Sequence, residues 1–404
     1  MSNAGIKHYI ASSLLLTLSI LISIMIGEAL LRKLFDPVDY LQAQLIPDDI
    51  LGHRVRPDRY DSWGFRNKAV PASVKVVAIG DSQTYSILTT ASDSWPGKLQ
   101  KLTGQDVYNL SLGGYGPVQY YQLLKDKAFQ LNPSLVIVGF YFGNDIFDAY
   151  NMVYTKDYWR HLRRPDLVIG AEPSVQISKP ATPREHKFLG GIRNWLAENS
   201  ILYRISVFSF GNVFQFLEVK YSRSTIDPDI TILENKEAQI RTAFRPLEEL
   251  HGLDLQDARV QEGLRLTLQL FREMRDLCSE RGVEFVVVLI PTKESVFAEY
   301  IAENKDIRNS NIINQLLGNE REASRLSKSY FNEHGITYID VLPDIRRALP
   351  KTNPYPRNLD GHLNPTGNEA VARAIQNTLK DVGRKPTNSA QATYDGNSAP
   401  KVVQ

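Results

Sequence analysis

Apolar and polar positions alternate along most of the chain in a way that predicts a parallel sheet covered by helices. Five short runs rich in Val, Ile, Leu and Phe have the composition of buried strands, and they cover Val74–Ile79, Asp106–Leu110, Leu135–Phe140, Val283–Ile290 and Ile336–Val341. Segments with helical spacing of apolar residues lie at Trp95–Leu102, Pro117–Gln130, Leu255–Arg281, Arg321–Glu333 and Pro365–Val382. This alternation is typical of an α/β domain with helices on both faces of the sheet.

The amino-terminal segment departs from this pattern. From His8 to Gly27 the sequence contains no Asp, Glu, Lys or Arg, and about twenty helical residues span the roughly 30 Å hydrocarbon core of a bilayer. We therefore expect residues 1–34 to form a transmembrane anchor. A cleaved signal peptide is the alternative, although no small-residue cleavage site follows the run. Lys7 before the run and Arg32 and Lys33 after it leave the orientation open.

The rest of the chain divides into three segments, of which the second contains an insertion. Residues 35–72 are predicted as a linker between the anchor and the first strand, and residues 73–383 as the globular domain. An insertion at about 147–252 interrupts this domain; its apolar part, from 188 to 219, could form a lid, a surface on the membrane or ordinary packed helices. Residues 384–404 are polar and rich in Pro, Ser and Asn, which predicts a disordered tail.

Charge and composition exclude several functional classes. The 47 basic and 45 acidic residues are spread along the chain, so we expect no nucleic acid, whose binding needs a concentrated basic face. A single cysteine, Cys278, excludes an internal disulfide framework and a cysteine-based zinc site. No spacing among the seven histidines resembles a metal site, and we expect no metal.

The first predicted strand ends in the sequence AIGDSQTY, which places Ser82 at a strand-to-helix turn. A side chain at such a turn projects over the edge of the sheet, where free backbone N–H groups can bind an anion. Ser82 is therefore a candidate nucleophile. A serine that only caps a helix is the alternative interpretation of the same position.

Candidate hydrogen-bond donors follow the next two strands. The loop NLSLGGYGP contains Gly113, Gly114 and Gly116, so that a backbone N–H can approach a ligand closely, and YFGNDIFD contains Asn144. The Ser82 N–H, a loop glycine N–H and the Asn144 amide together could stabilise the charge of a tetrahedral intermediate. Each of these residues, taken singly, could also be an ordinary turn former.

A candidate base lies near the carboxyl terminus. The sequence NLDGHLNPTGN places Asp360 two residues before His362, and a carboxylate at one ring nitrogen can hold a histidine as a base at the other. The alternative is a histidine that caps a helix or lies on the surface. The other six histidines have no comparable surroundings in the sequence; they are His8, His53, His161, His186, His251 and His334.

Four short motifs, in this order, resemble the conserved blocks of the SGNH hydrolase superfamily, also called GDSL esterases and lipases; they are Gly80-Asp81-Ser82, Asn109–Gly114, Gly143-Asn144-Asp145 and the Asp360/His362 pair. The resemblance implies a flavodoxin-like three-layer α/β/α sandwich with a parallel sheet of about five strands. It also implies Ser82 as nucleophile, His362 as base and Asp360 as the residue that orients it, with an oxyanion hole formed by Ser82, Gly114 and Asn144. It covers about Lys75–Asn144 and Val283–Val382.

Two features depart from the usual SGNH pattern. The aspartate lies two residues before the histidine instead of three, and Phe142 occupies the position of a usual glycine. The spacing in Asp360–Gly367 also resembles the SGNH-like polysaccharide O-acetyltransferases of the alginate type. Those proteins often carry a P-x-K element after a strand, comparable to Pro291-Thr292-Lys293. The same tripeptide is also typical of a turn that ends a strand.

These features predict ester hydrolysis or acyl transfer, most simply of acetyl on a cell-surface or exported glycan, by a membrane-anchored, periplasmic or otherwise extracytoplasmic domain. A serine acyl-enzyme needs no cofactor. Two alternatives stay open: an esterase directed at lipids, favoured if the apolar part of the insertion lies on the bilayer, and a non-catalytic binding or assembly component that keeps the fold. No feature of the sequence predicts a protein partner.

Overall fold

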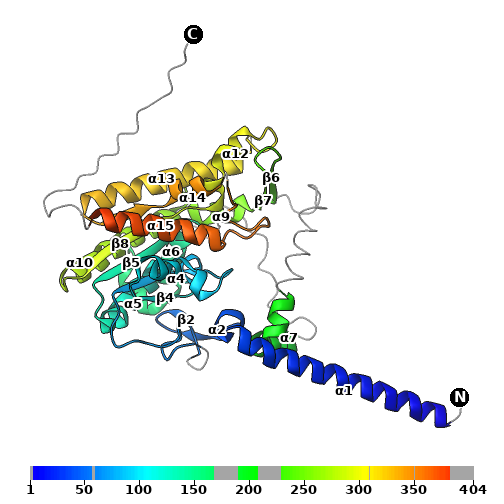
Figure 1. The fold of residues 1–404 in the computed structure, drawn as a ribbon. Coiled ribbons are helices and arrows are strands. Elements are labelled where there is room, and N and C mark those ends of the chain that lie inside the picture. Colours follow the sequence, from blue (N-terminus) through cyan, green and yellow to red (C-terminus); the bar gives the residue numbers. More distant parts are fainter. Residues whose placement is uncertain are drawn as a thin grey trace.

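The computed structural model describes residues 3–56, 60–167, 190–207, 229–308, 310–349 and 351–382. A five-stranded parallel sheet with strand order β4-β3-β5-β8-β9 forms its centre (Figure 1). The strands are β3 (Val76–Gly80), β4 (Val107–Ser111), β5 (Leu135–Tyr141), β8 (Glu284–Ile290) and β9 (Thr337–Asp340). This order is that of flavodoxin-like folds, and it confirms the predicted α/β architecture with its five strands.

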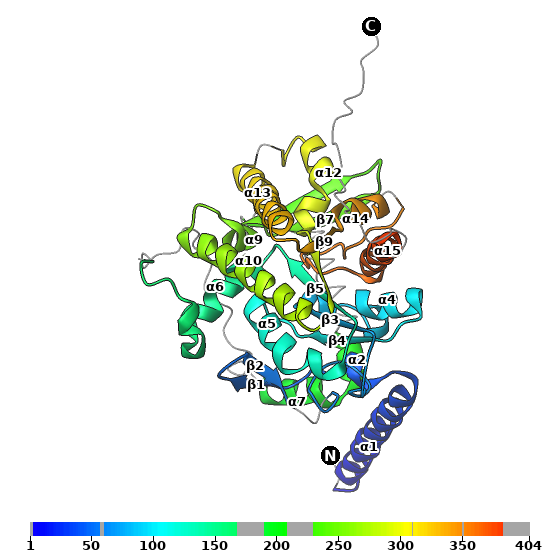
Figure 2. The same ribbon diagram turned by 90° about the vertical axis from the view of Figure 1, so that its left-hand side faces the viewer.

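Helices cover both faces of the sheet. Every residue of β3 and β5 is buried, and successive side chains point to opposite cores: Val138 packs with α5 and α10, whereas Ile137 packs with α4 and α15. Figure 2 shows these two layers on either side of the strands. The helices are α4 (Trp95–Thr103), α5 (Pro117–Asp126), α6 (Asp145–Thr155), α9 (Pro246–Leu253), α10 (Ala258–Ser279), α11 (Lys293–Val296), α12 (Ala298–Glu303), α13 (Asn311–Glu333), α14 (Leu342–Ala348) and α15 (Pro365–Val382).

The start of helix α13 differs from the expectation. The sequence predicted a helix from Arg321, but α13 begins ten residues earlier, at Asn311. The Ser310 hydroxyl accepts the N–H of Ile313 and caps the helix there, and the side chains of Ile313 and Leu317 add to the buried core. The apolar residues of this first part are thus core residues of the helix, because the cap lies before them.

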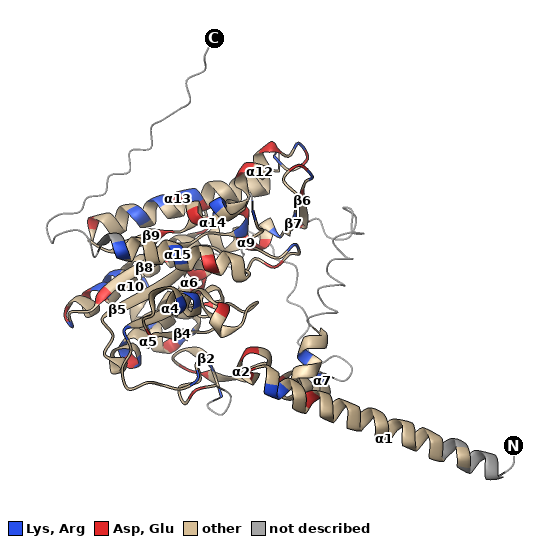
Figure 3. Cartoon of the chain, in the orientation of Figure 1, with Lys and Arg blue, Asp and Glu red and all other residues tan. Residues whose placement is uncertain are grey.

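Helix α1 (Asn3–Leu34) extends away from the domain (Figure 1). Its segment Ala11–Leu34 has a mean hydropathy of 2.3 and no buried residues, so it is long and apolar enough to cross a membrane. In Figure 3 the charged residues of the coloured part of this helix lie only towards the end that joins the domain. The helix leaves a large apolar surface uncovered by the rest of the chain. A surface of this kind is typical of a segment that contacts lipid or another apolar partner.

The segment between α1 and the sheet is packed against the domain. It contains α2 (Pro37–Tyr40) and an antiparallel hairpin formed by β1 (Leu45–Asp48) and β2 (Gly52–Val55). Val55 and Phe65 are buried in the same core as α5 and α10. Residues 35–72, predicted as a linker, therefore also contribute to the core through their described part.

One described part of the insertion is hydrogen-bonded to helix α1. The carboxylate of Glu28 in α1 accepts hydrogen bonds from the Ser200 hydroxyl at 2.9 Å and from the N–H groups of Ile201 and Leu202 at 3.0 Å. These residues directly follow α7 (Gly190–Asn199), which lies beside the end of α1 (Figure 1). The glutamate thus caps the helical residues 201–207 from a different helix, so that this part of the insertion is docked on α1.

A second part of the insertion packs in the ordinary way. The strands β6 (Thr231–Asn235) and β7 (Ile240–Phe244) form an antiparallel hairpin, and Leu233 and Phe244 are buried in the core shared with α4 and α15. Residues 208–219 of the apolar stretch and the predicted tail at 384–404 lie outside the described residues. The described parts of 147–252 therefore include α7 and the helical residues 201–207 beside α1, the core hairpin, and most of helices α6 and α9. The remaining short elements are the 3-10 helices at Ala91–Asp93, Ala128–Leu131 and Asp157–Leu162.

Candidate active site

Ser82 lies at the carboxyl edge of the sheet, immediately after β3. It begins the short helix α3 (Ser82–Tyr85), which Asp81 caps by accepting the N–H of Gln83 at 2.9 Å. A Cβ atom on Gly80 would lie 2.0 Å from the Thr84 hydroxyl oxygen, so only glycine permits this tight strand-to-helix turn. The turn thereby holds the half-buried Ser82 side chain above the end of the strand.

Ser82, His362 and Asp360 form a continuous chain of hydrogen bonds. The Ser82 Oγ lies 2.8 Å from His362 Nε2, and His362 Nδ1 lies 2.7 Å from Asp360 Oδ1. Because the Asp360 carboxylate can only accept, Nδ1 carries the proton of the neutral ring and Nε2 accepts the hydroxyl proton of Ser82. The structure therefore brings together the three residues named from the sequence, across 280 positions of the chain.

The surroundings of Asp360 favour its ionised form. Burial alone would raise the pKa of its carboxyl group. The hydrogen bonds from the His362 ring and backbone, together with the positive charge of Lys293, outweigh burial and hold this pKa below its usual value. A carboxylate in that state keeps the imidazole in the tautomer that leaves Nε2 free to accept a proton.

The loop that carries Asp360 and His362 is fixed by a buried cation. The Nζ of Lys293 lies 2.7–3.2 Å from four backbone carbonyl oxygens, and these belong to Ala243, Pro356, Asn358 and Asp360. The lysine is 2% exposed, and burial lowers its pKa to about 8. A charged donor shared by three carbonyls of one loop holds that loop in a single conformation.

Gln83 joins the histidine loop to the serine turn. Its Nε2 donates to the carbonyl of Gly361 at 3.1 Å, and its Oε1 accepts the N–H of Leu363 at 3.3 Å. The side chain is 2% exposed. These two bonds flank His362 on both sides, so the residue next to Ser82 directly fixes the distance between the two loops.

A glycine turn lies beside Ser82. Leu112 to Tyr115 form a turn in which the Leu112 carbonyl accepts the Tyr115 N–H at 3.2 Å, and Gly114 has a φ of 77° that favours glycine. A Cβ atom on Gly113 would lie 3.7 Å from the Ser82 Cβ. The turn after β4 is therefore in van der Waals reach of the serine.

Asn144 follows β5 at the same carboxyl edge of the sheet as Ser82, and the carboxyl group of Asp148 holds its side chain. Its Nδ2 donates to Asp148 Oδ2 at 2.8 Å, while its Oδ1 is buried without a hydrogen-bond partner among the described residues. Burial and the negative charge of Asp81 raise the pKa of Asp148 to about 7. Burial likewise raises the pKa of Asp81 to about 6. Of the predicted group, Asn144 has no direct hydrogen bond to Ser82 or His362 in the described residues.

Two of the residues that hold the site escaped prediction. Gln83 carries no signal beyond its place next to Ser82, and its partners lie near the opposite end of the chain. The sequence places Lys293 in a P-x-K element or a strand-ending turn, and neither interpretation predicts its contacts with the histidine loop. The turn is present, since the Thr292 hydroxyl caps α11, but a lysine three residues after a buried strand is also a signal for a buried cation.

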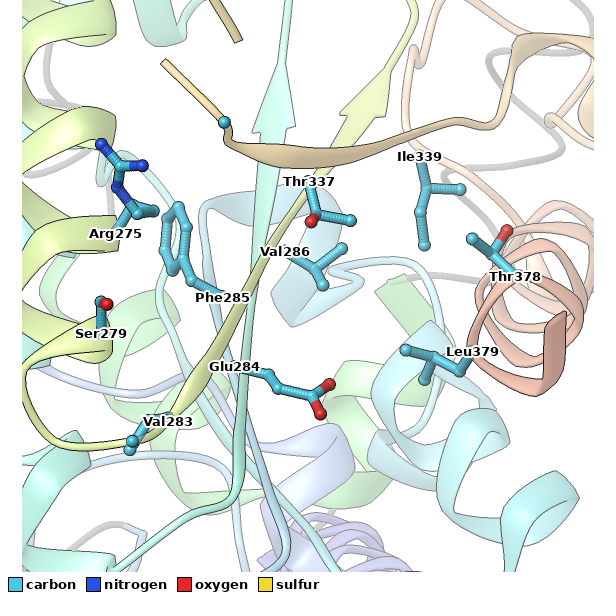
Figure 4. A pocket seen from close by; sticks show the side chains of 12 residues that line it. Arg275, Ser279, Val283, Glu284, Phe285, Val286, Thr337, Ile339, Thr378 and Leu379 are labelled. Atoms are coloured by element: carbon cyan, nitrogen blue, oxygen red, sulfur yellow. The ribbon is translucent and has the colours of Figure 1, made fainter. Parts of the chain in front are cut away.

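Two pockets in the described part of the chain lie away from Ser82. One has a volume of about 400 Å³ and surrounds the amino-terminal ends of β8 and β9, with Arg275 and Ser279 of α10 on one side and Thr378 and Leu379 of α15 on the other (Figure 4). The other, of about 600 Å³, lies between residues 36–39, 66–74 and α4. In the described part of the chain, no group of three or more His, Cys, Asp or Glu could hold a metal ion.

Comparison with known families gives one match. The family described as "SGNH hydrolase-like domain, acetyltransferase AlgX" matches residues 250–402. This range contains Lys293, Asp360 and His362, whereas Ser82 and Asn144 precede it. With the five-stranded sheet, the match confirms that the chain resembles SGNH hydrolases and has an SGNH-like fold. A comparison with curated proteins found no match.

Several solved structures align with the chain at low similarity. A lipolytic protein of the G-D-S-L family from Desulfitobacterium hafniense DCB-2 is 13% identical, with 76% of this chain and 100% of that chain covered and a TM-score of 0.35. A GDSL-like lipase from Bacteroides thetaiotaomicron is 10% identical, with 78% and 93% covered and a TM-score of 0.35. An acetylxylan esterase from Geobacillus stearothermophilus is 11% identical, with 80% and 99% covered and a TM-score of 0.34.

Proposed function

We propose that this chain, which resembles SGNH hydrolases, is a membrane-anchored serine esterase or O-acyltransferase that forms an acyl-enzyme on Ser82. The observation that carries the proposal is the hydrogen-bond chain from Asp360 through His362 to Ser82, at 2.7 and 2.8 Å. A serine hydroxyl is a weak nucleophile on its own, and an adjacent oriented base is the arrangement that activates it. The alternative role of Ser82 as a plain helix cap would not require this partner.

In the first half of the reaction, Ser82 Oγ attacks the carbonyl carbon of the ester. His362 Nε2 takes the hydroxyl proton as the new C–O bond forms, and the carbonyl oxygen acquires the negative charge. When the tetrahedral intermediate collapses, the bond to the leaving oxygen breaks and His362 returns the proton to that oxygen. Asp360 keeps the ring oriented and stabilises the imidazolium that exists between the two proton transfers.

The negative charge on the carbonyl oxygen needs donors. We propose the Ser82 N–H, the Gly114 N–H and the Asn144 side chain, all of which follow neighbouring strands at one sheet edge. Asn144 has a second amide hydrogen besides the one it donates to Asp148. One well-placed donor of this kind is worth about a hundredfold or more in rate.

In the second half, water or an acceptor hydroxyl attacks the acyl group on Ser82. His362 takes the proton of the attacking group and returns it to Ser82, which completes the cycle. We propose acetyl on a cell-surface or exported glycan as the transferred group. The support is the match to a family described as an acetyltransferase, together with the anchor, and no feature of the site selects between water and a glycan hydroxyl.

We further propose that α1 is a single-pass anchor and that the domain is periplasmic or otherwise extracytoplasmic. The support is the exposed apolar surface of α1 and its attachment to the insertion through Glu28. Fusion of a reporter that is active only outside the cytoplasm to the carboxyl terminus tests the location. Activity of the reporter is expected, and an inactive reporter on a membrane-bound chain would contradict it.

Turnover of an acetyl ester by the full-length chain in detergent micelles tests the chemistry. We expect turnover by the wild type and near-complete loss in Ser82→Ala and in His362→Ala. His161→Ala serves as the matched control, because His161 is exposed and lies outside the site. Addition of an oligosaccharide separates the two activities, since a transferase forms the acetylated sugar and an esterase forms acetate. Turnover that survives Ser82→Ala would refute the proposal.

A further inference from the structure

His53 belongs to the hairpin that connects the anchor to the sheet, yet its ring reaches the glycine turn beside Ser82. Its Nε2 lies 3.0 Å from the carbonyl oxygen of Gly113. Because a carbonyl only accepts, Nε2 carries the proton and donates it. We propose that His53 is a positioning residue that orients the Gly113–Gly114 peptide so that its N–H faces the reacting carbonyl group. This inference rests on the proposed function and adds a residue to its site.

The geometry of the turn makes such a contact necessary. The turn closes with the Leu112–Tyr115 hydrogen bond, and its two central residues are Gly113 and Gly114. Only Gly114 has a positive φ, so the turn is of type II. Types I and II differ mainly in the orientation of the central peptide, which is rotated by about half a turn between them. Two successive glycines allow either type, since neither residue has a Cβ that would disfavour one of them. An additional hydrogen bond to this peptide therefore decides its orientation.

His53 donates that hydrogen bond to the carbonyl oxygen of the peptide, on one side of the turn. The C=O and N–H of a trans peptide point in opposite directions. While the Gly113 carbonyl points to His53, the Gly114 N–H faces the opposite side of the turn and stays free for a ligand. Rotation of this peptide would turn the N–H towards the histidine and remove one donor from the proposed oxyanion hole. Gly114 is exposed at this point of the surface, so a substrate can reach it.

The histidine is itself well fixed. Its backbone pairs with Pro47 across the β1–β2 hairpin, and its carbonyl accepts the Tyr115 hydroxyl at 2.9 Å. The rings of His53 and Tyr115 lie 5.1 Å apart between their centroids. A Cβ atom on Gly114 would lie 3.3 Å from His53 Cε1, so the ring closely covers this side of the turn. The hairpin thus presents the donor in one orientation.

Two substitutions of similar size test the inference in the full-length chain. His53→Gln keeps an N–H donor on a flexible side chain, and His53→Met removes the donor. We expect kcat for an acetyl ester to fall about 10- to 100-fold in His53→Met with little change in KM, because the loss of an oxyanion donor acts mainly in the transition state. His53→Gln is expected to recover a large part of kcat. His161→Met, at an exposed histidine outside the site, is expected to leave kcat unchanged.

The outcomes separate this inference from the proposed function. If the wild type turns over esters and requires Ser82, but His53→Met and His53→Gln have equal kcat values, the positioning role is wrong. A rise in KM without a fall in kcat would equally overturn it. The melting temperature of each variant is also measured, so that only variants of equal stability are compared. A higher kcat in His53→Gln than in His53→Met then supports the positioning role. Absence of any Ser82-dependent turnover in the wild type would instead refute the proposed function.

Discussion

Ser82 and His362 approach each other from two regions that are fixed by different means. Ser82 directly follows the turn after a fully buried strand in the middle of the sheet, so backbone geometry and one cap decide where it lies. His362 lies in the connection between α14 and α15, whose described residues form no helix or strand. Side chains from elsewhere hold this loop, chiefly Lys293 and Gln83. The proposed nucleophile is thus positioned by the fold, and the proposed base by a few replaceable contacts.

This difference teaches where substitutions should matter. On the side of the base, a change several residues from the reacting atoms should reduce kcat, because it releases the loop that carries the base. On the side of the nucleophile, the sheet holds the turn, and a change next to Ser82 can alter stability before it alters geometry. The predictions below test this division, beginning with the largest effect.

Asp360→Asn should produce the largest loss. An asparagine can present its amide to the ring, which favours the tautomer with the proton on Nε2, and His362 then cannot accept the proton of Ser82. We expect kcat to fall about a thousandfold or more in an ester hydrolysis assay, with the melting temperature nearly unchanged. A fall of less than tenfold would mean that Asp360 does not orient the base, and the two-residue spacing to His362 would then have another explanation.

Lys293→Met should affect both activity and stability. Methionine fills a similar volume but leaves the loop carbonyls without their charged donor. Loss of such a buried donor costs about 2 to 4 kcal/mol of unfolding free energy, and we expect kcat to fall roughly tenfold to a hundredfold because the base loses its fixed position. Denaturant unfolding and ester turnover measure the two effects.

The matched control for this variant is Lys328→Met. Lys328 pairs with Asp340 at 2.6 Å, and both side chains are about one-third exposed, so about 1 kcal/mol or less is expected. If Lys293→Met loses stability but keeps its kcat, the lysine is a structural residue only. The comparison between the two regions would then lose its main support on the side of the base.

Asp81→Asn should have the smallest effect, and it concerns stability. Burial raises the pKa of Asp81 from its usual value of 3.8 to about 6 in the folded chain. The folded state therefore binds this proton more tightly, so the stabilising contribution is complete below about pH 4 and is lost as the pH rises through about 6. The neutral asparagine can still accept the Gln83 N–H. It should stabilise the chain at pH 8 by up to about 3 kcal/mol, and have little effect at pH 4.

Thermal unfolding at the two pH values measures this difference. Asp306→Asn, at an exposed aspartate, is the control and should show the same melting temperature as the wild type at both. If Asp81→Asn lowers the melting temperature at pH 8, the ionised carboxylate is needed for the cap of α3. Ser82 would then depend on a charge as well as on the sheet.

The sequence predicted which strand-borne candidates lie together at one edge of the sheet, for a physical reason. Strands β3 and β5 are buried on both faces, so their sequences are continuous apolar segments that are easily recognised. Because the strands are parallel, the residues that follow them lie at one edge of the sheet. This reasoning placed Ser82, Asn144 and the glycine loop at that edge, and the SGNH resemblance then named Gly114 in the loop. The pair Asp360/His362 was found through short-range spacing alone.

The contacts that hold the loops around the site could not be predicted in the same way. Gln83 lies 278 residues from Gly361, and His53 lies 60 residues from Gly113, and no periodicity links such positions. The start of α13 was missed because its cap, Ser310, was not recognised as a helix start. Local patterns therefore predict elements, whereas side-chain bonds between loops become visible only once the chain is folded.

The acyl-enzyme itself is the most direct test of the central claim. The full-length chain is mixed with an acetyl ester, quenched in acid during turnover, digested and analysed by mass spectrometry. We predict one acetyl group on the peptide that contains Ser82 in the wild type, and none in Ser82→Ala or His362→Ala. An acetyl group on a different residue, or turnover by the wild type with no acetylated Ser82, would contradict the account.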